Sequence, residues 1–79
     1  MVSSDDIRRR IEAALPGAQV TVADSTGAGD HFEVCVRADA FVGRTLVEQH
    51  QLVYGALGTL MGRIHALALQ TETPQEARG

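Results

Sequence analysis

The 79-residue chain contains one cysteine, no lysine and no tryptophan. A single cysteine excludes an internal disulfide framework, so a hydrophobic core must hold the fold. Apolar runs are too short to cross a membrane, and the first residues lack the basic and apolar regions of a secretory signal peptide. We therefore expect a cytoplasmic protein without membrane association, built as a single domain over residues 1–79 with a frayed tail from about residue 72.

Positive charge is also scarce. The chain has seven basic residues, all arginines, against ten acidic ones, for a formal net charge of −3. Nucleic-acid-binding modules are usually basic, because phosphate neutralisation dominates their affinity. The only basic cluster is three arginines at residues 8–10, close to Asp5, Asp6 and Glu12, which is typical of a solvated helix face with pairs such as Arg8–Glu12. This composition argues against a dedicated nucleic-acid module without excluding one.

The first half of the chain predicts a helix and a β-hairpin. Residues 3–6 form a polar helix start with acids in the first turn, and apolar side chains follow at helical spacing until Pro16. Alternating apolar residues then predict two strands, at residues 19–23 and 31–37. The stretch between them, residues 25–30, contains two glycines and predicts the turn of the hairpin.

The second half predicts a turn, a helix and a third strand. Thr45 can cap the helix, glycines within it predict a break near Tyr54-Gly55, and Gly62 predicts its end. Residues 64–71 are apolar on both faces, as expected for a strand covered on one side and flanked by neighbours. The order αββα(α)β predicts an α+β two-layer sandwich, with a three-stranded mixed sheet and helices on one face.

Two of the three histidines, His31 and His65, each stand at the first residue of an apolar, strand-like run. Strands joined through a helix are usually parallel neighbours, and parallel strands start at the same edge of a sheet, so we expect both imidazoles at one end of the sheet. Neutral imidazole suits zinc, copper and iron, but two histidines do not close a structural metal site. A metal there would need ligands from a partner; the alternative is that each histidine is an ordinary polar residue.

Three other features carry weaker signals. Cys35 lies four residues from His31, roughly 13 Å along a strand, which fits a small buried hydrophobe better than a nucleophile. Glycines at positions 27 and 29 favour a hairpin loop over a phosphate loop, because they do not open a helix. His50 lies on the polar part of the second helix, and helix-turn-helix readout by residues 45–61 would have little positive charge to offer a groove.

Four sequence blocks, taken in order, resemble the BolA family and are closest to its small IbaG-like bacterial branch. The blocks are DHFEV at residues 30–34, FVGR at 41–44, QLVYG at 51–55 and IHALAL at 64–69, with Thr-Pro at 73–74 beyond them. The resemblance covers nearly the whole chain. It implies a class II KH-like αββαβ sandwich with an extra helical turn, in agreement with the order of elements above.

The resemblance also implies a function, that of a non-enzymatic adapter in iron–sulfur trafficking and iron regulation. BolA-like proteins bind monothiol glutaredoxins and share a [2Fe–2S] cluster with them, for which the glutaredoxin and its glutathione supply thiolates. The family's C-terminal ligand histidine corresponds to His65 here, and histidine ligation on one side tends to raise the cluster potential. We expect the cluster only in that complex, and a monomer or weak homodimer when the chain is alone.

The chain departs from the family at three places. The loop cysteine of many relatives falls on Ala28, which cannot coordinate, so His31 or an external group is left as the second ligand. The basic Arg-His-Arg of many relatives is Glu-Gln-His at residues 48–50, which weakens the DNA binding proposed for the family, and Ala77 replaces the usual tryptophan. A nucleic-acid-binding transcriptional regulator using residues 43–61 stays open as the alternative, whereas no nucleophile–base–orienter set indicates an enzyme.

Overall fold

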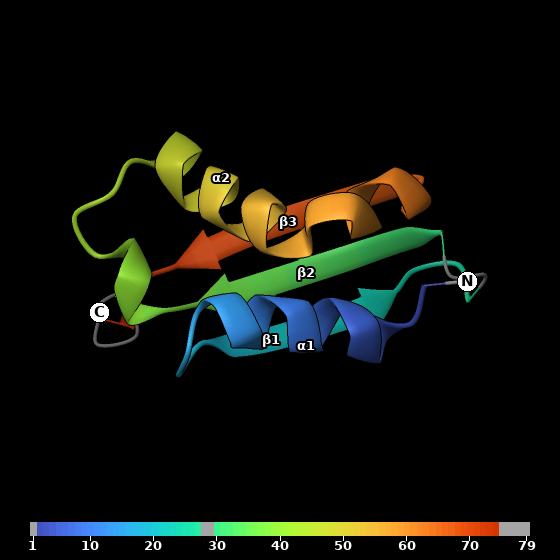
Figure 1. The fold of residues 1–79 in the computed structure, drawn as a ribbon, viewed down its shortest axis with the longest axis horizontal. Coiled ribbons are helices and arrows are strands. Elements are labelled where there is room, and N and C mark those ends of the chain that lie inside the picture. The colour runs from blue at the N-terminus through green and yellow to red at the C-terminus, as the bar shows by residue number, and fades with distance from the viewer. Residues whose placement is uncertain (1, 28–29, 75–79) are drawn as a thin grey trace.

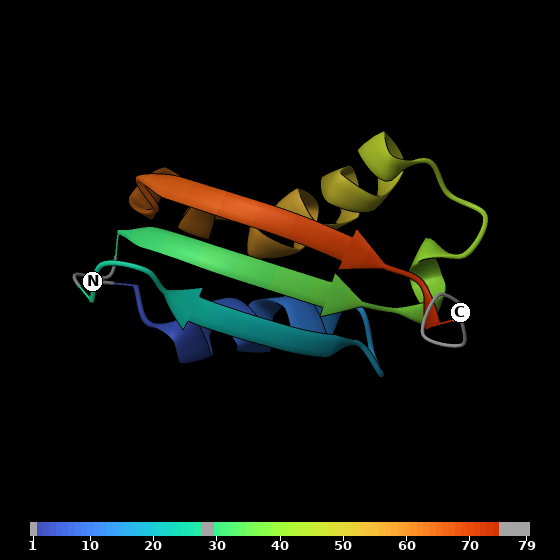
Figure 2. The ribbon, with the colours of Figure 1, turned by 180° about the vertical axis from the view of Figure 1, so that it is seen from behind.

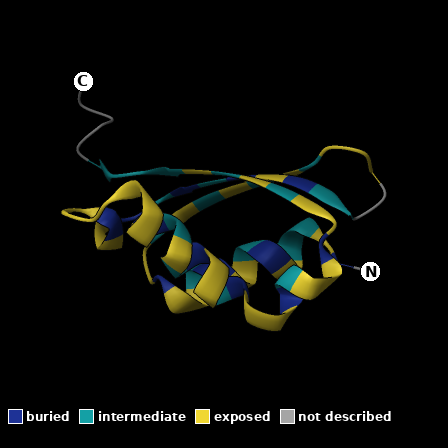
Figure 3. Ribbon diagram, turned by 90° about the horizontal axis from the view of Figure 1, so that it is seen from above, coloured by how far each residue is buried: buried dark blue, intermediate teal, exposed yellow. Residues whose placement is uncertain are grey.

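The structure is a computed structural model that describes residues 2–27 and 30–74 (Figure 1). One sheet of three strands is covered on one face by helices, which confirms the predicted α+β sandwich (Figure 3). The elements are, in order, α1 (Ser4–Ala14), β1 (Gln19–Asp24), β2 (His31–Arg37), the 3₁₀ helix η1 (Asp39–Phe41), α2 (Leu46–Leu57), the 3₁₀ helix η2 (Gly58–Arg63) and β3 (Ala66–Glu72). Within the described residues, no helix has the length and apolar character needed to cross a membrane.

The strands lie in the order β1-β2-β3, with β1 antiparallel and β3 parallel to β2 (Figure 2). The predicted hairpin and the predicted parallel crossover are therefore both confirmed. The expectation that the third strand is flanked by neighbours is wrong, because among the described strands β3 lies at the edge of the sheet and pairs with β2 alone. Its apolar outward positions are Ala66 and Ala68, small side chains that are exposed at little cost.

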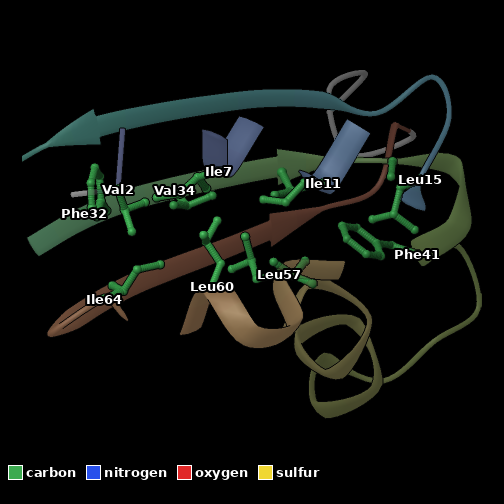
Figure 4. Packing of buried hydrophobic residues seen from close by; sticks show 13 residues of the cluster. Val2, Ile7, Ile11, Leu15, Phe32, Val34, Phe41, Leu57, Leu60 and Ile64 are labelled. Atoms are coloured by element: carbon green, nitrogen blue, oxygen red, sulfur yellow. The ribbon is translucent and has the colours of Figure 1, made fainter. Parts of the chain in front are cut away.

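The hydrophobic core fills the space between the helices and the inner face of the sheet (Figure 4). Alternate side chains of β2 point into it, as the predicted strand pattern requires. The largest fully buried side chains come from α1, β2, η1 and α2, and they are Phe41, Ile7, Ile11, Leu57, Val36 and Val53. No helix of the described residues covers the opposite face of the sheet, where many side chains are exposed or half-buried (Figure 3).

Both α-helices begin at a reciprocal capping box. The Ser3 hydroxyl accepts the backbone N–H of Asp6 while the Asp6 carboxylate accepts that of Ser3, and Thr45 and Glu48 repeat this arrangement at α2. Each cap satisfies backbone groups that have no partner within the helix, and a side-chain cap typically contributes about 1 kcal/mol. The predicted starts of both helices are confirmed.

The end of α2 differs from the prediction. The helix continues through Tyr54 and Gly55 and ends at Leu57, where Gly58 adopts a positive φ of 54° and η2 begins. Burial of Val53 and Leu57 on the core side outweighs the cost of about 1 kcal/mol for a glycine inside the helix. Gly62 accordingly lies within η2 and does not end the helix.

The third strand is also displaced from its predicted bounds. It begins at Ala66, two residues later than predicted, because η2 continues to Arg63. It ends at Glu72, which pairs with Arg37 across the sheet, so the chain is still part of the sheet where the frayed tail was predicted to begin. Residues 75–79, including Ala77, lie outside the described residues.

Gln49 forms a buried polar link that the sequence pattern did not predict. Its side-chain amide donates to the carbonyl oxygens of Phe41 and Arg44, at 3.4 and 3.1 Å, and its oxygen accepts the Thr71 hydroxyl at 2.6 Å. One side chain thereby joins α2 to the loop before it and to β3. Because the Gln49 side chain is buried, replacing its hydrogen-bond partners by water would cost free energy of folding.

We expect Gln49→Ala to lower the free energy of unfolding by about 2 kcal/mol, since it leaves the Thr71 hydroxyl and the Arg44 carbonyl without this partner. Urea unfolding followed by far-ultraviolet circular dichroism measures the change. The matched control is Gln51→Ala, an exposed glutamine on the same helix, which should change stability by less than about 0.5 kcal/mol. Equal unfolding midpoints for the two variants would show that the link contributes nothing.

Candidate functional site

The two imidazoles lie together at one end of the sheet, as the predicted parallel pairing requires. His31 is the first residue of β2, and the register pairs it with Ala66, the first residue of β3. His65 immediately precedes β3, so its predicted place inside the strand is wrong by one residue. The ring centroids are 5.0 Å apart and the ring planes meet edge to face at 72°.

Asp30 connects the two histidines through separate groups. Its backbone carbonyl accepts the N–H of His65 at 2.9 Å and that of Ala66 at 3.0 Å, which closes the start of the parallel ladder. Its carboxylate accepts the Thr26 hydroxyl at 3.0 Å and lies 3.2 Å from Nδ1 of His31. The Thr26 hydrogen bond, aided by the charge interaction with His31, holds the pKa of Asp30 below its ordinary value.

The Asp30 carboxylate determines which ring nitrogen of His31 donates a hydrogen bond. An ionised carboxylate only accepts hydrogen bonds, so Nδ1 of His31 is the donor in this contact, and when the ring is neutral its lone pair is on Nε2. A histidine held in this way resembles the metal ligands whose second nitrogen donates to a carboxylate. The sequence did not identify Asp30 as a site residue. Its position directly before His31, at the end of the hairpin loop, could have indicated that role.

Both imidazoles are accessible. His65 is exposed, and the His31 side chain keeps 38% of its surface open. Beside His31 lies a shallow hollow of about 350 Å³, whose lining includes Ser25, Glu33 and Ala68. In residues 2–27 and 30–74, no group of three or more His, Cys, Asp or Glu side chains is arranged to hold a metal ion. The two imidazoles can supply at most two ligands to a metal group.

The other candidate residues lie apart from this pair. Cys35 sits in the middle of β2, where burial, with a smaller contribution from the Glu72 charge, raises the pKa of its thiol. His50 lies on α2 and contacts Tyr54 edge to face, with ring centroids 6.1 Å apart. Ala28, at the position of the loop cysteine of many relatives, lies outside the described residues.

Comparison with known proteins identifies the family of this chain. The sequence profile of the BolA family, described as BolA-like protein, matches residues 10–76. The chain belongs to the BolA family. The fold therefore has the BolA architecture that the four sequence blocks predicted.

Three BolA relatives illustrate the likeness. Protein BOLA2 of Arabidopsis thaliana is 36% identical over 78 residues, which cover 96% of this chain and 84% of the relative. The DNA-binding transcriptional regulator BolA of Escherichia coli is 30% identical over 87 residues, covering 100% of this chain and 83% of the relative. The solved structure of a BolA protein homologue from Coxiella burnetii is 41% identical, with a TM-score of 0.83 and full coverage of both chains.

We expect Cys35 to react more slowly with iodoacetamide in the folded protein than in the unfolded chain, because partial burial raises the pKa of the thiol and only the thiolate attacks. Alkylation measured by mass spectrometry across a pH series should have its midpoint at higher pH in the folded protein than in urea. Glu72→Gln should move the folded midpoint downward, since it removes a negative charge that opposes the thiolate. Coincident folded and unfolded profiles would contradict the assignment.

Proposed function

We propose that this BolA-like protein is a non-enzymatic adapter that binds a monothiol glutaredoxin and shares a [2Fe–2S] cluster with it, in iron–sulfur trafficking and iron regulation. The observation that supports the proposal is the accessible imidazole pair, 5.0 Å between centroids, without enough neighbouring ligands in the described residues to close a site. His65 is the first proposed ligand and His31 the second. The glutaredoxin and its glutathione would supply the thiolates.

The chain's own residues prepare this edge of the sheet for a shared group. Asp30 orients the His31 ring and, through its carbonyl, fixes the backbone that carries His65. The His65 ring is exposed and can contact a partner surface. Cys35, in contrast, lies in the middle of β2, away from this edge of the sheet. When bound, the cluster is cargo, and histidine ligation on one of its sides tends to raise its reduction potential.

His65→Ala tests the proposal directly. After co-expression with a monothiol glutaredoxin, visible absorption and circular dichroism report the mixed complex, and this variant should lose or strongly alter its spectrum. His31→Ala should alter the spectrum less if an external group can replace it. His50→Ala is the matched control, because His50 lies on α2 and contacts Tyr54, and it should leave the spectrum unchanged. An unchanged spectrum for His65→Ala would refute the ligand assignment.

DNA binding is a second candidate function, favoured by the similarity of this chain to the DNA-binding transcriptional regulator BolA of Escherichia coli. Residues 43–61 would provide the contact surface. Their exposed side chains include Leu46, Val47 and Tyr54, and their only basic residue is Arg44. This function requires retention on DNA at about 50 mM salt with a steep loss as salt rises, so the absence of a band shift at low salt would remove it.

A further inference from the structure

A second hollow, of about 380 Å³, lies between α1 and η2 on the helical side of the molecule. Three arginines, Arg9, Arg10 and Arg63, contribute to its lining, together with the buried side chain of Leu60. We refer to this feature as the arginine hollow. It concentrates positive charge in a chain whose formal net charge is −3.

Two of these arginines, Arg10 and Arg63, form no close ion pair with a carboxylate in the described residues, although the charge of Arg10 acts on Asp6. Arg10 donates to the Leu57 carbonyl at 3.3 Å, which caps the end of α2, and the Arg63 guanidinium makes no hydrogen bond or ion pair in residues 2–27 and 30–74. Arg8, Arg9 and Arg37 are neutralised, in the pairs Arg8–Asp5, Arg8–Glu12, Arg9–Asp5 and Arg37–Glu72, whereas Arg44, outside the hollow, bonds within the described residues only to the Ala40 carbonyl. Acidic residues outnumber basic ones, so the unpaired charge at this hollow does not reflect a shortage of carboxylates.

One carboxylate of the chain itself lines the hollow, and it is already engaged. Asp6 accepts the backbone N–H of Ser3 at 3.1 Å in the α1 capping box, and this hydrogen bond is the largest cause that lowers the pKa of Asp6. Because Arg9 is already paired with Asp5, two guanidinium groups, those of Arg10 and Arg63, face this one carboxylate, and the hollow keeps a net positive charge. The planar guanidinium fork of arginine matches a carboxylate through two parallel hydrogen bonds, which favours an oxyanion as the missing occupant.

The arginine hollow lies near the imidazole pair, and this position indicates which molecule would carry the oxyanion. Arg63 is two residues from His65, so their Cα atoms are at most about 7 Å apart. The orange coil of η2 lies beside the starts of β2 and β3, at the end of the molecule that carries the imidazoles (Figure 1). A typical protein interface, with about 800 Å² per partner, is wider than the separation between the Cα atoms of Arg63 and His65.

A protein carboxylate fits this setting better than a nucleic-acid backbone. The helix that carries Arg9 and Arg10 also carries Asp5, Asp6 and Glu12, which would repel the regularly spaced phosphates of a duplex. A single acidic side chain needs only one receiving site, and such contacts give a protein interface its specificity. Arginine is also enriched at protein interfaces.

We propose that the arginine hollow seats a surface carboxylate of the protein that docks against the imidazole pair, with Arg63 and Arg10 as the receiving groups. This inference rests on the proposed function, because it assigns the docking chemistry of the same partner. The inference predicts an acidic residue on the surface of the partner, beside the cluster that the partner would share with His65. The contact operates before any cluster is bound, since neither arginine is a ligand.

Arg63→Glu is the decisive variant. Isothermal titration with a cluster-free monothiol glutaredoxin should show a dissociation constant raised roughly tenfold, and a weaker dependence on salt than the native chain shows. Arg44→Glu is the matched control, because it makes the same charge change at an exposed arginine outside the hollow that also has no carboxylate partner in the described residues. It should change affinity less than about threefold. Arg63→Gln should fall between the native chain and Arg63→Glu.

The outcomes separate this inference from the function on which it rests. Equal affinities for Arg63→Glu and Arg44→Glu, in a system where His65→Ala still abolishes the cluster spectrum, would overturn the docking role alone. Arg63→Glu should recover the cluster spectrum at saturating glutaredoxin, because the ligands are intact. Failure of the native chain to bind the glutaredoxin would overturn both proposals. Loss of DNA retention in Arg63→Glu with unchanged glutaredoxin affinity would assign the hollow to phosphate instead.

Discussion

The parallel pairing of β2 with β3 is the constraint on which the candidate site depends. The Asp30 carbonyl starts this ladder by accepting two successive backbone N–H groups, those of His65 and Ala66. The register that follows, from His31 opposite Ala66 to Arg37 opposite Glu72, brings the two imidazoles to one edge. A shift by one residue would turn Leu67 and Leu69 away from the core, so burial of these side chains and placement of the histidines are specified together.

The helical layer supports this pairing from the other side of the sheet. A parallel pair needs a long crossover, which α2 and η2 supply between β2 and β3. Gly58 makes the change from α2 to η2 at a positive φ that other residues rarely adopt, and the Arg10 guanidinium bonds to the carbonyl just before it. Gln49 then attaches α2 to Thr71 on β3. The crossover is therefore fixed at both ends. Arg63, its last helical residue, lies near the edge of the sheet where His65 lies.

Local rules predicted the parts of the fold that depend on a few neighbouring residues. Ser3 and Thr45 marked the starts of the helices, and the alternation from Phe32 to Val36 marked the inner face of β2. The meeting of His31 and His65 was also predictable, because it follows from strand order and connection type alone. These features need no knowledge of how side chains from distant segments pack.

Features that depend on tertiary packing were not predictable in the same way. The glycine at position 55 suggested a break, yet the buried contacts of Val53 and Leu57 keep α2 continuous through it. Gln49 and Asp30 act through partners on other elements, and a polar residue in the sequence does not reveal whether it will be buried. Spacing along α1 indicates which arginines can reach an acid on the same helix, but it does not indicate that Arg63 has no acidic partner in residues 2–27 and 30–74.

The arginine hollow and the imidazole pair divide the proposed recognition into two physical tasks. Exposed guanidinium groups act at long range, so they set the rate of encounter with an acidic partner and its dependence on salt. Imidazole nitrogens act only at bonding distance, so they set how long a shared group stays bound once the surfaces meet. Because Arg63 and His65 are two residues apart on one continuous segment, a partner held by the first is already positioned for the second. Docking without cargo and transfer of cargo would then use the same end of the sheet but different residues.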